Sequence, residues 1–315
     1  MYKYPHTTFF FATLFVASFL SVFLGSKLPL LYEKGTDMLA AVFFTPSITV
    51  PELKAAYNGT HPTHRTLKIL IVPGHEPFTG GTEYGGVTER NLTVLLANDL
   101  RDILGKNKKY EVFVTRNQLS WHEPLVSYFK NQGEAIDSWR REKQLSMNAL
   151  VASGTVTLSI PIVHGKANSD DARRLYGVQK WANEQDYDVI LHIHINDYPR
   201  KGKEKKYTGL ALYVPEHQYS NADASQTLAA YMFKELNTVI GTSTLKEEKS
   251  GVVEDQELIA ISRFNTADTA NVLIEYGYIY EPQYQGTNEV RDQALYTYAL
   301  KTYQGLEDFF GDTKN

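Results

Sequence analysis

Cysteine is absent from the 315-residue sequence. Its absence excludes disulfide bridges, thiolate zinc sites and cysteine nucleophiles. A chain without cysteine suits an exported bacterial protein, although many cytosolic chains also lack this residue. Internal repeats are absent as well, so we do not expect a repeat architecture.

Concentrated positive charge is also lacking. The 32 Lys and Arg residues are spread along the chain and are outnumbered by 36 Asp and Glu residues, which gives a net charge of −4. Because phosphate binding needs a concentrated basic face, we expect no nucleic-acid partner. Aromatic residues are plentiful instead. The 21 Tyr and 15 Phe supply enough aromatic area for a large core and for a sugar- or peptide-binding surface.

The N-terminus carries one long apolar run. Thr7–Leu24 reads TTFFFATLFVASFLSVFL and contains no charged residue. A helix that crosses a bilayer needs about 20 apolar residues, and the run reaches this length if residues 25–31 are included. A cleaved signal peptide is the alternative, but Leu24-Gly25-Ser26 is a poor cleavage site. We therefore expect residues 1–31 to form one transmembrane helix that anchors the chain, with a cleaved signal as the alternative.

The remaining sequence divides into a connector and one domain. Residues 32–66 have mixed polarity, three prolines and no sustained period, and are predicted to be a linker. From residue 67 to 313, strand patterns alternate with helix patterns. This alternation predicts an α/β fold with a mostly parallel twisted sheet covered by helices on both faces. The expected strands are Leu67–Val72, Tyr110–Thr115, Val189–Ile195, Leu210–Val214 and Asn271–Tyr276, and the expected helices are Arg90–Leu104, Asp170–Gln185, Asn221–Ile240 and Val290–Phe310.

Chemically reactive side chains follow the ends of the expected strands. His75 follows the first strand, Glu89 begins the next helix, and His194 and Glu275 lie near the ends of two later strands. Ligands of parallel sheets bind at this carboxyl edge, where two imidazoles and two carboxylates would converge. Two His and one Glu form a ligand set of catalytic zinc, which keeps its fourth position open for water. The remaining carboxylate could act as a general base.

Each of these residues also has an ordinary structural interpretation. His75 could be polar surface after a Pro-Gly turn, and His192 and His194 share one face of a strand as a buried hydrogen-bonded pair would. Glu89 is favourable in a first helical turn in any case. Glu275 is harder to explain, because a carboxylate within VLIEYG should be expelled from an apolar strand unless it is paired or functional. No two of these residues form a local metal motif such as His-Glu-x-x-His, so their spacing is only moderately specific.

The motifs around these residues resemble those of the amidase-3 type of N-acetylmuramoyl-L-alanine amidase, a family of zinc-dependent peptidoglycan amidases. That family opens with a strand, Pro-Gly-His, a glycine-rich loop and a Glu that begins a helix, which correspond to ILIVPGH, TGGTEYGG and TERNLTVLLANDL. VFVTR matches a strand ending in Thr-Arg. WANEQDYDVILHIHIN resembles an Ala-Asn helix end followed by Ser-Ile-His-Ala-Asn, and NVLIEYGYI resembles the final Leu-Val-Glu-Leu-Gly-Phe strand. The resemblance covers most of residues 67–312.

The resemblance implies a metal centre and a reaction. Zinc would be bound by His75, Glu89 and His194, with Glu275 as the catalytic carboxylate. The reaction would be hydrolysis of the amide between N-acetylmuramic acid and L-alanine in peptidoglycan, during remodelling or lysis of the cell wall.

Two departures from the family pattern leave other functions open. Glu76 stands where a Gly is expected, and His192 stands where a Ser is expected. Together with Asn196 and Arg116 they are candidates for contacts behind the metal ligands or with substrate. Glu76 and His192 favour, as an alternative, a zinc hydrolase that acts on another envelope amide. A non-catalytic cell-wall-binding module is a further alternative, but it would be favoured by loss of a ligand or of the base, and neither is lost.

Location and control follow from this interpretation. Peptidoglycan lies outside the membrane, so we expect a single-pass protein of the bacterial cell membrane with its catalytic domain outside, or an exported protein if the N-terminal segment is cleaved. Residues 118–166 form an insertion with an expected helix at Glu134–Leu150 and a β-rich piece at Thr155–His164. The insertion could plug the open metal position through Glu123, Glu134 or Glu142, or it could line the substrate groove. A regulatory protein partner is a further candidate.

Overall fold

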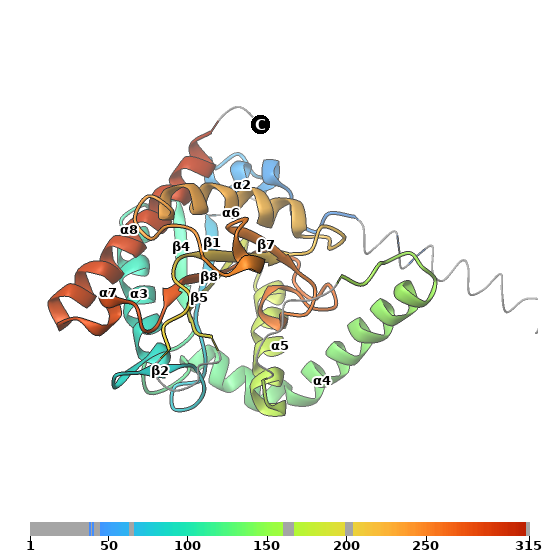
Figure 1. Cartoon of the computed structure of the whole chain (residues 1–315). Coiled ribbons are helices and arrows are strands. Elements are labelled where there is room, and N and C mark those ends of the chain that lie inside the picture. Colours follow the sequence, from blue (N-terminus) through green and yellow to red (C-terminus); the bar gives the residue numbers. More distant parts are fainter. Residues whose placement is uncertain are drawn as a thin grey trace, which may run out of the picture.

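The computed structural model describes residues 38, 40, 45–62, 66–159, 167–198 and 204–312. A six-stranded sheet lies at the centre with helices on both faces (Figure 1), which confirms the predicted α/β fold with a mostly parallel sheet. Within these residues, no helix combines the length and the apolar character that a membrane crossing requires. The anchor expected at residues 1–31 lies outside the described residues.

The strand order of the sheet is β4-β1-β5-β8-β6-β7. The first four strands in this order run parallel to one another, whereas β6 pairs antiparallel with β8 and parallel with β7. A separate hairpin is formed by β2 and β3. The strands are β1 (Leu67–Pro73), β2 (Glu83–Tyr84), β3 (Val87–Thr88), β4 (Tyr110–Val114), β5 (Val189–Asn196), β6 (Ala211–Pro215), β7 (Val252–Asp255) and β8 (Ala270–Tyr278).

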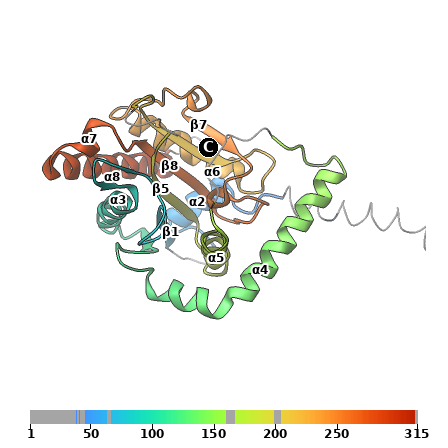
Figure 2. The ribbon, with the colours of Figure 1, turned by 60° about the horizontal axis from the view of Figure 1, so that its bottom comes forward.

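Two helical layers enclose the sheet, as Figure 2 shows. One layer contains α3, α6 and α8, and α2 packs against it; the other contains α5, α4 and η2. The helices are α2 (Val50–Tyr57), α3 (Glu89–Leu104), α4 (Glu123–Ala152), α5 (Ser169–Glu184), α6 (Ala222–Leu236), η1 (Lys246–Glu248), η2 (Ile259–Ile261), α7 (Pro282–Gln285) and α8 (Asn288–Gly311).

Strand β1 shows why both faces must be covered. Leu67, Ile69 and Ile71 belong to the core on the α3 side, whereas Leu70 and Val72 belong to the core on the α5 side. Successive side chains of a strand point to opposite faces, so a continuous apolar run leaves no face suited to water. The mostly apolar central strands therefore require helices on both sides and leave the strand ends as the accessible part of the sheet.

Helix α2 lies within the stretch that was predicted to be a linker. Thr49 and Glu52 form a capping box at its N-terminus. Leu53 is fully buried, and the ring of Tyr57 stacks on Phe310 of α8 at 4.7 Å. Lys54 Nζ donates to the carbonyl oxygen of Asp312 at 2.6 Å. Residues 50–57 therefore pack on the α/β domain.

The insertion is mainly a single helix. The helix expected at Glu134–Leu150 is the C-terminal part of α4, which begins eleven residues earlier at Glu123. The strand expected in Thr155–His164 does not form at residues 155–159, and the remainder lies outside the described residues. Side-chain amides explain part of this, because Gln218 and Gln256 bind the backbone of residues 157 and 159 in place of a neighbouring strand.

Candidate metal centre

Three predicted residues meet at the carboxyl edge of the parallel strands. His75 follows β1, Glu89 is the first residue of α3, and His194 lies near the end of β5. His75 Nε2 lies 2.8 Å from Glu89 Oε2, and His194 Nδ1 lies 3.0 Å from Glu89 Oε1. One ligand atom from each residue lies within 4.8 Å of the others. The two imidazoles thus approach one carboxylate from two sides, which is a donor set suited to a divalent cation.

The electrostatics of this cluster favour ionised Glu89 and neutral His194. Burial opposes ionisation of Glu89, but His75 and then His194 lower its pKa well below the usual range. The backbone amides of Thr82 and Ile195 also donate to this carboxylate, at 3.0 and 3.1 Å. Burial lowers the pKa of His194, with Glu89 acting in the opposite direction. A neutral imidazole keeps the lone pair that binds a metal ion.

Two glycines and the left-handed backbone of His75 allow the two imidazoles to approach Glu89 closely. A Cβ on Gly74 would lie 2.5 Å from Cε1 of His194, and a Cβ on Gly81 would lie 2.9 Å from Cδ2 of His75. His75 itself has a φ of 67°, a region that residues with a Cβ seldom adopt. Such strain persists only where the surrounding structure compensates for it, and it is concentrated at functional sites.

Glu275 lies on the strand next to His194. The two residues are direct register partners between β5 and β8. The Oε2 atom of Glu275 is buried and has no hydrogen-bond partner among the described residues. Burial, followed by the charges of Glu89 and Glu248, raises the pKa of Glu275 well above its ordinary value. A buried carboxylate oxygen without a partner, beside a cluster of potential metal ligands, is suited to a group that exchanges protons.

Comparison with known proteins identifies the family to which the chain belongs. A family model described as N-acetylmuramoyl-L-alanine amidase matches residues 69–293, which is more than half of the chain. The chain belongs to this family. It is therefore an amidase, and peptidoglycan is the substrate class of such enzymes. None of the curated proteins matches the chain.

Two solved structures share the fold of this amidase. The CwlD amidase from Clostridioides difficile, in complex with the GerS lipoprotein, is 14% identical with a TM-score of 0.50, and the match covers 78% of this chain and 99% of that one. The amidase Ami1 from Mycobacterium smegmatis is 15% identical with a TM-score of 0.51, and the match covers 78% and 97% of the two chains. At these identities the likeness shows the fold alone.

Arg116 of the amidase is a structural residue. Its side chain is fully buried and donates to the carbonyl oxygens of Pro73 at 3.2 Å, Arg90 at 3.0 Å and Gly74. Burial lowers its pKa to about 10, which leaves it charged at neutral pH. Arg116 therefore joins the end of β1 to the first turn of α3 and so holds His75 and Glu89 in place. Being enclosed, its side chain lies behind the proposed metal ligands.

Glu76 is engaged on the α5 side of the cluster. It accepts hydrogen bonds from Trp121 Nε1 at 2.8 Å and from Arg174 Nε at 2.6 Å. Arg174 also pairs with Asp171 at 2.8 Å. Glu76 thus ties the loop after His75 to α5 and to the start of the insertion.

His192 and Asn196 have different surroundings. His192 is almost fully buried, and apart from a weak interaction with the backbone of Ala260 neither of its ring nitrogens has a hydrogen-bond partner among the described residues. Burial and the neighbouring His194 lower its pKa to about 3, and the backbone of Ala260 offsets only part of this change. His192 is therefore neutral and does not join the metal cluster. Asn196 instead donates to Glu248 Oε1 at 3.0 Å.

Glu248 was missed by sequence reasoning. It is 1% exposed and accepts hydrogen bonds from the hydroxyls of Tyr213 at 2.6 Å, Tyr278 at 3.0 Å and Ser243, as well as from Asn196. The run Lys-Glu-Glu-Lys around it has the pattern of a solvated loop, so no local signal marks it. Its donors explain why this carboxylate is buried, and three of the four, Asn196, Tyr213 and Tyr278, come from distant segments.

A second cluster of potential metal ligands was also missed. His217 Nδ1 lies 2.5 Å from Glu216 Oε1 and 2.9 Å from Glu254 Oε2, at the ends of β6 and β7. The His217 side chain is 70% exposed, and the hydrogen bond that it donates to Glu254 raises its pKa. Glu216 is in addition bound by the side-chain amides of Gln218 and Gln256. An ion-paired histidine accounts for this group.

The insertion does not bring a carboxylate to the metal centre. Glu123, Glu134 and Glu142 are all exposed, and none belongs to the His75–Glu89–His194 group. The insertion contacts this region through Trp121 instead. In the described residues, none of these three carboxylates is therefore placed to plug the metal position, and the groove-wall interpretation stays a prediction.

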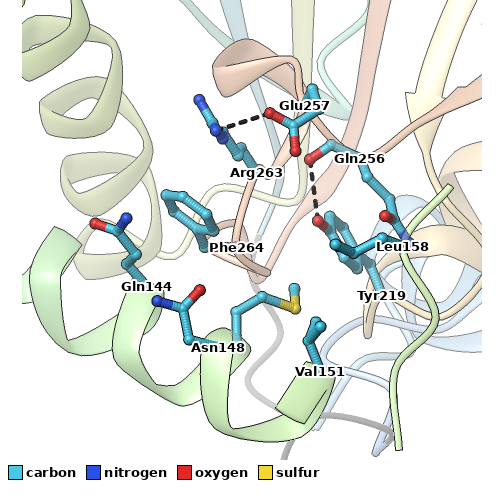
Figure 3. A pocket seen from close by; sticks show the side chains of 10 residues that line it. Gln144, Asn148, Val151, Leu158, Tyr219, Gln256, Glu257, Arg263 and Phe264 are labelled. Carbon is cyan, nitrogen blue, oxygen red and sulfur yellow. Dashed lines mark hydrogen bonds and ion pairs between the residues drawn. The ribbon is translucent and has the colours of Figure 1, made fainter. Parts of the chain in front are cut away.

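The structure also contains a pocket of about 210 Å³, whose lining side chains are drawn in Figure 3. It is formed between the C-terminal part of α4 and the loop that contains Arg263 and Phe264. Arg263 pairs with Glu257 at 2.7 Å on its rim. None of the predicted site residues lines this pocket, so it is not the reaction site. Its lining residues are Gln144, Met147, Asn148, Val151, Leu158, Tyr219, Gln256, Glu257, Arg263 and Phe264.

Proposed function

We propose that this amidase uses zinc to hydrolyse the amide between N-acetylmuramic acid and L-alanine. The observation that carries the proposal is the approach of His75 and His194 to the single buried carboxylate of Glu89, with Glu275 as the register neighbour of His194. In this proposal His75, Glu89 and His194 hold the zinc ion and Glu275 is the general base.

The residues present fit a zinc ion in chemistry and in space. Two imidazoles and one carboxylate form a common ligand set of catalytic zinc, and three protein ligands leave a position for water or substrate. Gly74 and Gly81 leave room for the two imidazoles to converge. The hydrogen bonds from Thr82 and Ile195 to Glu89 would orient the carboxylate, as partners behind a metal ligand do.

The chain's own residues would then move the proton. A zinc ion held there would lower the pKa of bound water towards roughly 7, polarise the amide carbonyl and favour the ionised form of nearby Glu275. Glu275 would take the proton of the attacking water at Oε2 and deliver it to the leaving nitrogen of L-alanine. Arg116 would keep the β1–α3 turn, and with it His75 and Glu89, in register during this transfer.

Digestion of purified peptidoglycan tests the bond that is cut. Cleavage as proposed releases stem peptides with a new amino terminus on L-alanine, and that terminus can be labelled and identified. A new amino terminus on any other residue would favour the alternative of another envelope amide. Glu76, one of the two departures that suggested this alternative, is held by Trp121 and Arg174, so its charge is already paired.

The proposal includes a location for the amidase. We place it in the bacterial cell membrane as a single-pass protein, anchored by residues 1–31 with the catalytic domain outside, because its substrate lies there. Membrane fractionation tests the location, and the mass of the mature protein tests cleavage. A soluble mature protein that has lost its first residues would show that the segment is a signal peptide and that the amidase is exported.

A regulatory protein partner is also part of the proposal. An enzyme that cuts the wall outside the membrane needs restraint, and the CwlD structure contains a lipoprotein with the amidase. Solubilised membrane proteins from the source cells should change the rate at which the purified amidase digests peptidoglycan. An unchanged rate over a range of membrane-protein concentrations would argue against a membrane-bound regulator.

A further inference from the structure

Three tyrosines and two lysines form a surface beside the metal centre, which we call the tyrosine–lysine surface: Tyr84, Tyr198, Lys205, Lys206 and Tyr207. Tyr198 follows β5 and Tyr207 precedes β6, and their rings meet edge to face with centroids 4.7 Å apart. Lys206 Nζ lies 5.0 Å from the centroid of each ring. Both rings are half-buried and Lys206 is exposed, so this surface presents aromatic groups and positive charge together.

Residues just beyond β8, the strand that carries Glu275, form hydrogen bonds that hold part of this surface in place. The hydroxyl of Tyr280, just beyond β8, donates to the carbonyl oxygen of Tyr207 at 2.8 Å and accepts from its backbone amide at 3.0 Å. Glu281 accepts from the backbone amide of Gly209 at 3.0 Å. Two hydrogen bonds to the backbone of Tyr207 fix that backbone relative to the end of β8, which reduces the conformational entropy lost when a ligand contacts the residue.

The β2–β3 hairpin extends the surface. Lys205 Nζ lies 5.5 Å from the ring centroid of Tyr84, and the Tyr84 ring meets that of Tyr280 at 6.1 Å. The turn of this hairpin uses Gly85 and Gly86 at φ of 58° and 81°. A tyrosine from the hairpin and two from the β5–β6 connection thus lie around the same pair of lysines.

Thr82 connects this surface directly with the metal centre. Its backbone amide donates to Glu89 Oε2 at 3.0 Å, and its hydroxyl donates to Asp197. Asp197 in turn accepts from the backbone amide of Tyr198 at 2.8 Å. The proposed zinc ligand and the first tyrosine are therefore separated by two residues only, so a substrate bound at the metal centre would extend over Tyr198 and its neighbours.

We propose that the tyrosine–lysine surface is a substrate subsite next to the amide that is cut. It binds a sugar ring of the glycan strand and a carboxylate of the attached stem peptide. Tyrosine rings offer flat apolar faces for the C–H face of a pyranose and carry hydroxyls for its polar edge. Lysine ammonium groups donate charge-assisted hydrogen bonds to carboxylates. The inference rests on the proposed peptidoglycan substrate and adds the residues that recognise it.

The test uses the full-length amidase in detergent with two pairs of variants. Tyr198→Leu removes the aromatic face and Tyr198→Phe keeps it; Lys206→Met removes the charge and Lys206→Arg keeps it. Tyr296→Leu on α8 and Lys108→Met at the opposite edge of the sheet are matched controls, because both residues are exposed. Binding to insoluble peptidoglycan is measured by sedimentation in a Glu275→Gln background. KM and kcat are measured on soluble glycan–peptide fragments.

The expected pattern separates recognition from folding. Tyr198→Leu and Lys206→Met should each weaken binding and raise KM by about 3- to 10-fold, more than they lower kcat, because uniform binding is lost. Tyr198→Phe and Lys206→Arg should restore most of the loss, and the two controls should match the wild type. If the Tyr198→Leu variant does not fold, the comparison of Lys206→Met with Lys206→Arg tests the subsite, because Lys206 is exposed.

Two negative results have different meanings. If the wild type cuts peptidoglycan with the expected new amino terminus but Lys206→Met and Tyr198→Leu keep the wild-type KM and binding, the subsite is overturned and the proposed function stands. If the wild type releases no such terminus, the proposed function fails, and the subsite fails with it.

Discussion

Gly74 lies directly against the imidazole of His194. A Cβ at position 74 would lie 2.5 Å from Cε1 and 2.7 Å from Nδ1 of that ring, well inside van der Waals contact. Gly74 does not have a left-handed φ, so an alanine there is compatible with the backbone. The glycine is required only by the approach of the β1 turn to a proposed zinc ligand.

Gly74→Ala should therefore displace His194 without unfolding the protein. We expect overpacking to lower the free energy of unfolding by about 1–3 kcal/mol and zinc affinity to fall by about 10–100-fold. Competition with a chelator of known affinity measures the second effect. Gly133→Ala on α4 is the control, because nothing lies within 4 Å of its Cβ position. Equal zinc affinity in the two variants would contradict the role of Gly74.

Removal of any proposed zinc ligand should abolish metal binding. His75→Ala, Glu89→Ala and His194→Ala each leave two ligands, too few for a stable catalytic site. Elemental analysis of the purified proteins measures the zinc content. His217→Ala removes the histidine of the second cluster and should keep one zinc per chain. Stoichiometric zinc in all three ligand variants, or its loss in His217→Ala, would place the metal elsewhere.

Glu275→Gln should separate metal binding from chemistry. Glutamine has nearly the same shape but cannot accept the proton, so we expect zinc to be retained and kcat to fall by about 10²–10⁴-fold. Release of stem peptides from peptidoglycan measures the rate, and elemental analysis checks the metal. A rate close to that of the wild type would show that another group is the base.

The same variant should be more stable than the wild type at neutral pH when metal is removed. The folded protein raises the pKa of Glu275 above its ordinary value of 4.5, mainly through burial. Between these two pKa values the folded state binds more protons than the unfolded state, so stability falls as pH rises, by up to about 1.4 kcal/mol per pH unit. Glu275→Gln removes this titration. The difference in free energy of unfolding between Glu275→Gln and the wild type should be absent near about pH 4 and appear by about pH 7.

Urea unfolding in the presence of a chelator measures this difference. The wild type and Glu275→Gln are compared at several pH values between those limits, and only the difference between them is interpreted because other groups titrate in both. A difference that stays constant with pH would show that the carboxyl of Glu275 is not perturbed in the folded, metal-free protein.

Arg116→Met should destabilise the protein strongly. The change removes a buried charge and leaves the carbonyl oxygens of Pro73, Gly74 and Arg90 without this donor. We expect the free energy of unfolding to fall by about 3–5 kcal/mol, as when one partner of a buried charged network is lost. Arg101→Met is the control, since the side chain of Arg101 is 41% exposed and pairs with exposed Asp102. That change should cost less than about 1 kcal/mol. Similar losses in both variants would argue against the structural role of Arg116.

Local patterns predicted the strands whose own sequence is apolar enough to require burial. The apolar stretches at Leu67–Val72, Val189–Ile195 and Asn271–Tyr276 are strands β1, β5 and β8 with small shifts at their ends. Helix α2 and strand β7 were missed because short segments of mixed polarity become ordered only by packing on distant residues, as Tyr57 does on Phe310. The extent of α4 was underestimated because only four of its thirty residues are buried, which leaves no clear periodic apolar face.

By itself, the sequence determined the candidate site residues and the edge of the sheet on which they would lie. Parallel strands end on one side, so His75, Glu89, His194 and Glu275 had to be near one another once the strands were assigned. Only the tertiary structure decided which of them touch, and what surrounds them. The contact of both histidines with Glu89, the closure around Arg116 and the burial of Glu248 depend on donors and packing from segments far apart in the chain, and no local pattern encodes such distances.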